Sequence, residues 1–245
     1  MGARAMKGWL SQVTASLSFM DWSVTSNIEY NIIFPAVGAR NVALRISART
    51  SALISRSSYA RTDLRFINIH YYAAAATLYG GQARGGYQYD EQVYMGRNMH
   101  VEGYQTCADC HNPHTLEVKI ESCATCHEDV ESVDDLLDIR MNGSNVDFDG
   151  DGDDNEGIAG EIEGLQEILM AAMQAYTADV VGSPIVYDAL SYPYFFVDTN
   201  GNGALDDDEK NSDNGYKSFT ANLERAAYNY QVSVKDPGAY AHNPQ

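Results

Sequence analysis

The residues with the clearest chemistry lie in two Cys-x-x-Cys-His runs near the middle of the chain. The first run supplies Cys107, Cys110 and His111, and the second supplies Cys123, Cys126 and His127. This pentapeptide is the attachment signature of c-type haem, in which each Cys adds to a vinyl group and the His binds iron from one face. The runs use all four cysteines, so none is left for a disulfide or a catalytic thiol. The spacing predicts two covalently attached c-type haems.

Other uses of these cysteines explain less of the pattern. A structural zinc site could use both Cys-x-x-Cys pairs, but it would not explain why His follows the second Cys each time. A thioredoxin-like pair needs a βαβ context, whereas Gly103 to Thr106 reads as a polar loop. Disulfide frameworks suit short secreted chains, and this chain has 245 residues. A zinc-stabilised interaction module therefore stays open only for a protein that carries no haem.

The second axial ligand of each iron decides what the haem can do, because an open position favours binding of a small molecule. Four histidines lie outside the motifs: His70, His100, His114 and His242. His114 follows His111 too closely to reach the far face of the same iron, so we expect it on the haem of Cys123 and Cys126. His100 or His70 would then serve the first haem. Any histidines left over could bind haems elsewhere in a longer chain or in a neighbouring subunit, and Met95 and Met99 are alternative ligands.

Only eleven residues separate His111 from Cys123, so the two haems must lie close together. The segment from Cys107 to His114, followed by the second run, resembles the doubled module of multihaem cytochromes c. Residues 239–244 are also similar to the His-Asn-Pro segment that opens a late helix in pentahaem nitrite reductases, although the lysine-ligated CxxCK motif of that family is absent. The resemblance implies a mainly α fold of the multihaem cytochrome c type, with long loops, a haem-packed core and little sheet.

A twelve-residue loop, 198–209, matches the EF-hand calcium loop position by position. Gly203 permits the sharp turn, and Asp206 would bind directly or through water. The expected ligands are Asp198, Asn200, Asn202, the carbonyl group of Ala204, Asp206 and both oxygens of Glu209. The alternative interpretation is a solvated acidic turn.

An earlier acidic loop repeats the opening of this pattern with Asp147, Asp149, Asp151 and Asp153. Its twelfth position is Ile158, so closure would need Glu156 or Glu161 in a variant geometry. The two loops flank a predicted helix, so bound Ca²⁺ would neutralise carboxylates and fix that helix against the haem module. We expect calcium to be structural here, with a solvated acidic turn again as the alternative.

The net charge of −18 is unevenly distributed. Residues 1–66 hold eight Lys/Arg and three Asp/Glu, which leaves −23 for the rest of the chain. Such an acidic body argues against nucleic-acid binding. Haem attachment takes place outside the cytoplasm, so we expect a periplasmic or extracellular protein. The segment from Met1 to Phe19 is nevertheless a poor export signal, and no run reaches the length of a membrane span.

Three regions follow from these patterns. We expect an atypical or poorly ordered arm over 1–62, a dihaem module over 63–135, and a helical region with the calcium loops over 136–245. A 3.6-residue apolar period predicts helices over 158–181 and 216–234. Since Ala241 to Gln245 ends where a helix would be expected to begin, we expect a piece of a longer protein.

The leading hypothesis is an exported multihaem cytochrome that carries electrons between redox partner proteins, further haem domains or subunits. It is more consistent with a non-enzymatic carrier than with an enzyme, and a homo-oligomer or filament is compatible with it. The alternative is a fragment of a multihaem reductase or oxidase that acts on a small nitrogen or sulfur species at an open haem site.

Overall fold

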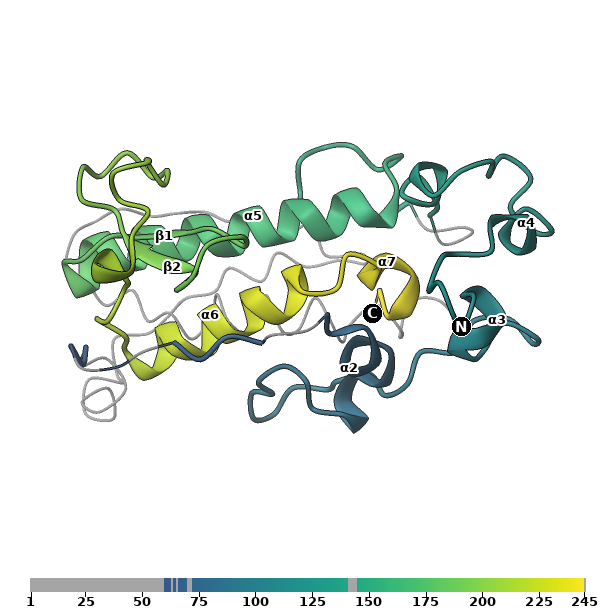
Figure 1. Ribbon diagram of the computed structural model, residues 1–245, viewed down its shortest axis with the longest axis horizontal. Helices are drawn as coiled ribbons and strands as arrows, with labels where there is room; N and C mark the ends of the chain where they lie inside the picture. Colours follow the sequence, from purple (N-terminus) through teal and green to yellow (C-terminus); the bar gives the residue numbers. More distant parts are fainter. Residues whose placement is uncertain (1–59, 63, 65, 70–71, 141–144, 245) are drawn as a thin grey trace, which may run out of the picture.

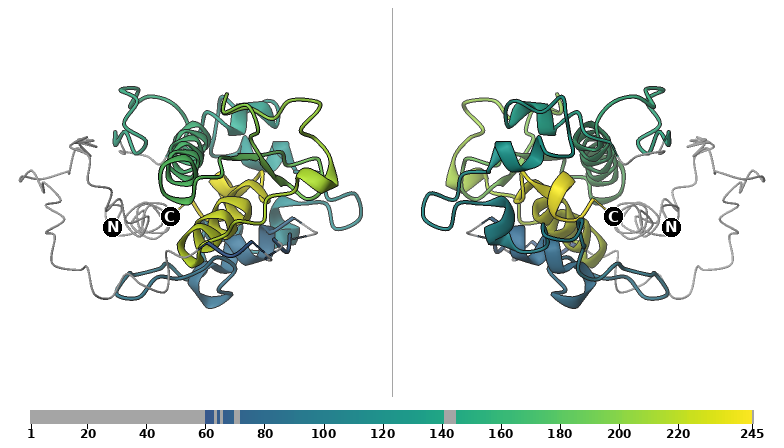
Figure 2. Two further views of the ribbon diagram at one scale, coloured as in Figure 1. Left: turned by 90° about the vertical axis from the view of Figure 1, so that its left-hand side faces the viewer. Right: turned by 90° about the vertical axis from the view of Figure 1, so that its right-hand side faces the viewer.

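Two antiparallel helices form the centre of the fold and run along its long axis (Figure 1). The computed structural model describes residues 60–244, apart from 63, 65, 70–71 and 141–144. Almost all of the predicted N-terminal arm, and the candidate ligand His70, therefore lie outside the described residues. The central helices are α5 (Ile158–Tyr176) and α6 (Ala221–Val234), and both are seen nearly end-on in Figure 2.

Helix α5 forms where the apolar period predicts it. Its buried apolar residues recur every three or four positions and therefore lie on one face. They are Ile158, Ile162, Leu165, Leu169, Met173 and Tyr176. The helix passes directly into a π-helical turn, η4 (Thr177–Val181), which ends at Gly182 in the left-handed region. The helical backbone therefore ends at Val181, as predicted, but its last five residues are π-helical.

The second predicted helix starts later than its apolar period suggests. Helix α6 begins at Ala221 because the side chain of Thr220 accepts a hydrogen bond from the amide of Leu223 at 3.1 Å, which caps the helix. The four residues before Thr220 are extended, and Tyr216 and Phe219 enter the core from that backbone. The prediction of a helix from Tyr216 was wrong at this end and right at Val234.

A two-stranded antiparallel sheet closes the end of the core that lies away from the Cys-x-x-Cys-His runs (Figure 1). It pairs β1 (Ile185–Tyr187) with β2 (Phe195–Val197), and Ile185 faces Val197. Phe195 packs edge-on against Phe66 and Phe219, with ring centroids 4.8 and 6.3 Å apart. The described residues are mainly helix and loop with little sheet, as the sequence predicted.

The remaining elements are short, and all of them except η5, which lies beside β2, are found toward the other end. They are α2 (Ala74–Tyr79), η2 (Gly80–Gln82), α3 (Cys107–Cys110), α4 (Ile120–Cys123), η3 (Asp134–Leu136), η5 (Ser212–Asn214) and α7 (Ala239–His242). The sequence suggested that a helix would begin where the segment from Ala241 to Gln245 ends. In the structure a helix, α7, already ends at His242 within that segment. Among the described residues, no helix is both long enough and apolar enough to cross a membrane.

Candidate haem and cation sites

The first motif forms the single-turn helix α3, which begins at Cys107 and ends at Cys110, so both cysteines lie on the same turn. The carboxylate of Asp109 accepts hydrogen bonds from the amides of Gln105 at 3.0 Å and Thr106 at 2.7 Å, which fixes the start of the turn. These bonds lower the pKa of Asp109, with the Thr106 amide as the largest cause. The turn ends at His111, whose backbone is extended.

The ring of His111 is oriented by the loop that follows it. Its Nδ1 lies 2.9 Å from the carbonyl oxygen of Leu116, and a carbonyl can only accept, so Nδ1 carries the proton. In the neutral ring, Nε2 then has the free lone pair that a metal requires. Leu116 lies in the left-handed region, with φ of 65°, and 72% of its surface is exposed. The exposed side chain does not explain this backbone conformation, whereas the hydrogen bond from His111 to the Leu116 carbonyl does.

The second motif is tied to the first through Lys119. Its amide donates to the Cys110 carbonyl at 2.8 Å, and its Nζ donates to the Ala108 carbonyl at 2.6 Å. Helix α4 starts at the next residue and carries Cys123 at its end. The amide of His127 then donates to the Cys123 carbonyl at 3.0 Å. The two attachment motifs thus form one bonded unit.

All four cysteines are free thiols in the structure. Burial raises the pKa of Cys110 and of Cys123, and the neighbouring Cys123 adds to the shift at Cys110. A zinc–thiolate site would hold its sulfurs about 4 Å apart. Among the described residues, which include all four cysteines, no three cysteine sulfurs come within 4.8 Å of one another. The described cysteine sulfurs thus form no preassembled cluster of three or four thiols.

Each motif histidine faces a second histidine from a distant part of the chain. The rings of His127 and His100 have centroids 6.3 Å apart and an interplanar angle of 45°. The rings of His111 and His242 have centroids 6.1 Å apart and an interplanar angle of 40°. These pairs differ from the expected ones, which placed His114 on the second site and His100 or His70 on the first.

The pairing of His100 with His127 also affects protonation. His100 is exposed overall, but partial burial lowers the pKa of its ring by desolvation, and charge on His127 lowers it further. Both effects favour the neutral imidazole, which is the form that binds a metal.

His242 reaches the first motif because α7 is anchored on two sides. The buried side chain of Asn243 donates to the carbonyl oxygens of Thr77 at 3.0 Å and Gly96 at 3.1 Å. Asp236, which precedes α7, lies within hydrogen-bond distance of the His242 ring. Burial raises the pKa of Tyr240, and charges on Asp236 and Cys123 add to the shift, so α7 also lies beside the second motif.

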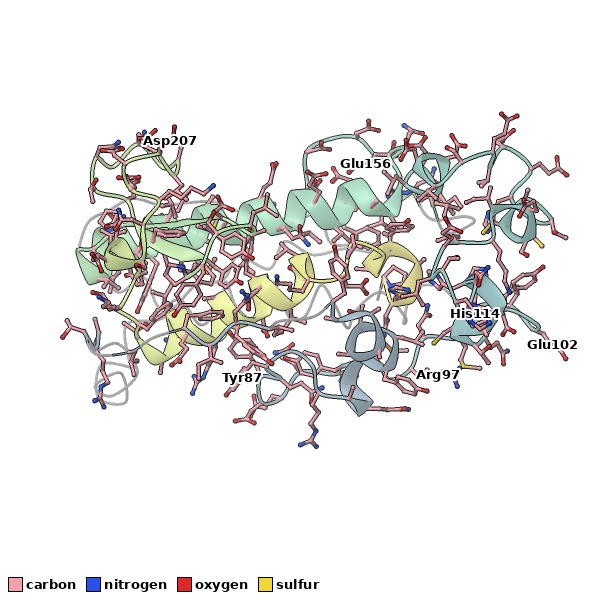
Figure 3. The ribbon with its side chains drawn as sticks, in the orientation of Figure 1. Tyr87, Arg97, Glu102, His114, Glu156 and Asp207 are labelled. Atoms are coloured by element: carbon pink, nitrogen blue, oxygen red, sulfur yellow. The ribbon has the colours of Figure 1, made fainter. Side chains whose placement is uncertain are left out.

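His114 stands apart from these pairs. It is exposed on the loop after His111, and its amide donates to the side chain of Asn112 at 2.9 Å. Figure 3 shows it at the end of the molecule that holds α3.

The acidic loop 198–209 follows β2 directly and folds around Asp198. The two carboxylate oxygens of Asp198 accept hydrogen bonds from the amides of Gly201 at 2.6 Å and Gly203 at 2.8 Å. Glu209 is 2% exposed, and its Oε1 accepts from both the amide and the hydroxyl of Thr199 at 2.6 Å. The hydroxyl of Thr199 is the largest cause of the lowered pKa of Glu209. The first and last positions of the loop are therefore both buried.

The middle positions of this loop are close together. The side-chain amides of Asn200 and Asn202 both donate to Asp206, at 2.6 and 2.9 Å. A flip of either amide would turn its oxygen to the same point, since the two ends of an amide have the same shape. The ligand oxygens expected from the sequence can thus meet, although the structure assigns the amide nitrogens to these contacts.

The earlier acidic loop repeats the same hydrogen-bond pattern. Asp147 accepts from the amides of Gly150 at 2.5 Å and Gly152 at 3.0 Å, three and five residues further on, as Asp198 does. Glu161 accepts from the amide at the second position, Phe148, at 2.5 Å, as Glu209 does from Thr199. Glu161 of α5 therefore occupies the closing role that position twelve occupies in the second loop.

Carboxylates gather closely in this first loop. Among the described residues, oxygens of Asp147, Asp149 and Asp151 lie within 4.8 Å of one another, and so do those of Asp149, Glu156 and Glu161. Glu161 is 1% exposed and forms an ion pair with Arg140 at 2.5 Å. Burial, followed by the charges of Glu161 and Asp149, raises the pKa of Glu156 to about 7. The structure therefore concentrates negative charge that a cation would relieve.

Two functional candidates emerged only from the structure, and it separates a third from its alternative. Asp236 and Asn243 orient and anchor His242, and their signal in the sequence is their closeness to that histidine. Glu161 was one of two options for closing the first loop, and its burial distinguishes it from Glu156.

The comparisons with known proteins point to one class. The chain is 24% identical over 257 residues to the C-type polyheme cytochrome OmcB of two Geobacter sulfurreducens strains, and this covers 89% of the chain. It has the same identity and coverage with the C-type polyheme cytochrome OmcC of that species. The chain spans 31% of the length of the OmcB proteins and 30% of OmcC. No family model and no solved structure matches it. The chain is thus a distant relative of multihaem c-type cytochromes.

Proposed function

We propose that the chain is an electron-transfer segment that holds two c-type haems, each between two histidines. His111 and His242 would bind the haem on Cys107 and Cys110. His127 and His100 would bind the haem on Cys123 and Cys126. The observation that carries the proposal is the presence of a second imidazole opposite each motif histidine.

The separation of the rings supports this assignment. Two imidazoles that bind opposite sides of one metal ion, each at about 2 Å, have their ring centroids about 6 Å apart. The distances here are 6.1 and 6.3 Å. Aromatic side chains in ordinary contact cover a similar range, but ordinary contact gives no reason for both pairs to contain a motif histidine. The interplanar angles of 40° and 45° are compatible because each ring can rotate about its bond to the metal.

The apolar surface near the motifs gives further support. Val93, Met99, Val101 and Leu116 are among the most exposed large apolar side chains of the described residues. Met99 and Val101 adjoin His100 in the sequence, and Leu116 follows His111 by five residues. Exposed apolar surface beside a site is typical of a region that a ligand or partner covers. Two porphyrins would cover part of this surface.

The ligand set also bears on the kind of activity. Bound haem supplies one-electron chemistry, and a site with two protein ligands has no open position for a substrate. The residues of this chain therefore favour a carrier over a reductase or oxidase. The partners would be redox proteins or further haem domains, in a periplasmic or extracellular setting, since c-type haem is attached outside the cytoplasm.

Calcium is the second part of the proposal. The loop 198–209 would bind one Ca²⁺ through Asp198, Asn200, Asn202, Ala204, Asp206 and Glu209. The loop from Asp147 would bind a second through Asp147, Asp149 and Asp151, with Glu161 as the closing carboxylate. Figure 3 shows Asp207 and Glu156, which mark the two loops, near opposite ends of α5. Both ions would therefore fix α5 in a structural role.

Removal of the distal histidines tests the haem assignment. In the haem-loaded chain, His242→Ala and His100→Ala should each open one iron. Each variant should then gain high-spin absorption and bind carbon monoxide at one of its two haems. His114→Ala is the matched control and should stay low-spin. If His114→Ala opens a site and the other two variants do not, the pairing proposed here is wrong.

A further inference from the structure

The distal histidine of the first site has a buried carboxylate behind it. Nδ1 of His242 lies 2.8 Å from Oδ2 and 3.0 Å from Oδ1 of Asp236. The Asp236 side chain is 2% exposed. A carboxylate can only accept, so Nδ1 carries a proton and donates it, and Nε2 of the neutral ring is free for iron.

No other axial histidine in the proposed pairs has such a partner. His111 donates from Nδ1 to a neutral acceptor, the carbonyl group of Leu116, at 2.9 Å. Within the described part of the chain, the rings of His100 and His127 make no hydrogen bond, and the only ion pair of Asp236 is with His242. The two sites therefore differ by one buried negative charge on a ligand.

From this difference we infer that Asp236 is a positioning residue that makes the haem on Cys107 and Cys110 the harder of the two to reduce. The inference rests on the proposed function. A carboxylate that accepts the outer N–H of a metal-bound histidine raises the basicity of that ligand. A more basic ligand and a nearby negative charge both favour the oxidised iron, which has the higher positive charge. Burial preserves the effect because water screens the charge little.

The inference predicts which of the two sites would hold a single shared electron. If both sites held haem and shared one electron, the charge of Asp236 would favour the oxidised state at the site of Cys107 and Cys110. No proton needs to move, since Nδ1 of His242 keeps its hydrogen in both states. Electrons would rest on the haem of Cys123 and Cys126.

The carboxylate also holds the ring in one orientation. Oδ1 of Asp236 accepts a hydrogen bond from the amide of Gly238 at 3.1 Å, so it fixes the backbone that leads into α7. A Cβ atom at Gly238 would lie 2.9 Å from Cε1 of His242, so the ring packs directly on the glycine. The side chain of Asp236 thus both positions the His242 ring and supplies the negative charge beside it.

Redox titration of the haem-loaded full chain tests the inference. Asp236→Asn removes the charge and keeps an oxygen that can accept from His242 and Gly238. It should raise the reduction potential of one haem by ~59 mV, which corresponds to about a tenfold change in the one-electron reduction equilibrium. The reduction potential of the other haem should stay almost unchanged. The electron paramagnetic resonance of the same haem should also change. Asp213→Asn is the matched control, because it removes an equal charge from η5, beside β2 at the opposite end of the molecule.

A second measurement does not depend on that variant. In His100→Ala only the haem on Cys107 and Cys110 stays low-spin, so its reduction potential can be identified. This potential should match the lower of the two potentials measured in the unmodified chain. The inference is overturned if this haem has the higher potential, or if Asp236→Asn shifts the potentials no more than Asp213→Asn does. A protein that carries no haem would instead overturn the proposed function.

Discussion

The side-chain amide of Asn243 donates a hydrogen bond to the carbonyl oxygen of Thr77 at 3.0 Å. The same nitrogen donates to the carbonyl oxygen of Gly96 at 3.1 Å, and Asn243 is 4% exposed. A single buried amide therefore joins the residue after His242 to the segment around α2, far away in the sequence.

Asn243→Ala should lower the free energy of unfolding by about 1–3 kcal/mol, because two partly buried carbonyl groups each lose a donor. Chemical denaturation measures this. Asn98→Ala is the control, since that amide makes only an exposed 3.4 Å bond to Ala241, and its effect should stay within about 0.5 kcal/mol. Equal effects from both variants would mean that Asn243 does not anchor α7.

The number of haems can be counted from mass. The intact protein should exceed its polypeptide mass by two haem equivalents, and replacement of Cys123 and Cys126 by Ser should remove one of them. A pyridine haemochrome spectrum gives an independent count. A mass that shows only zinc or disulfide bonds would exclude the cytochrome interpretation.

Glu209→Gln should weaken calcium binding, because the closing residue loses its charge and one ligand oxygen. Calcium that binds only the folded state stabilises it by about 2.7 kcal/mol at a hundredfold excess over Kd. A chelator should therefore lower the Tm of the unmodified protein and change that of Glu209→Gln much less.

Asp207→Asn is the control for that experiment. Asp207 is exposed and occupies the tenth loop position, which supplies no ligand. It should respond to chelator as the unmodified protein does. If chelator leaves the unmodified Tm unchanged, the acidic loops are solvated turns.

Stability in the absence of calcium should depend on pH through Glu156. Its pKa is raised to about 7 in the folded state from an unfolded value of 4.5, so folding favours the protonated carboxyl. The contribution of Glu156 to the free energy of unfolding is then fully present below pH 4.5 and is lost as the pH rises toward 7. Thermal unfolding in chelator between pH 4.5 and 7.5 should show this loss, and Glu156→Gln should reduce it. Added calcium should reverse the slope, and a flat profile in chelator would contradict the raised pKa.

Local patterns predicted helix α5 well, because it depends on residues close in sequence. Haem attachment at the two Cys-x-x-Cys-His runs and calcium binding by the acidic loop from Asp198 also depend on local residues, and they stay predictions. The start of α6 was missed because Phe219 continues the apolar period, while the cap at Thr220 and the packing of Phe219 determine the backbone.

The two histidine pairs could not be predicted because they depend on tertiary contacts. His242 meets His111 only because Asn243 fixes α7 beside α2. Order along the chain favoured His114 instead, yet its loop turns it outward. The closing role of Glu161 likewise required knowing which face of α5 is buried.

The two histidine pairs differ in how they could be completed as the chain reaches the compartment where haem is attached. If the chain enters that compartment N-terminus first, His100 arrives before its partner His127, so the second pair is complete once residues 100–127 are present. His111 must wait for His242, near the end of the described chain. In that case the first site would pass through a stage in which its motif is present and His242 is not, and a haem attached early would be exposed to other ligands on that side.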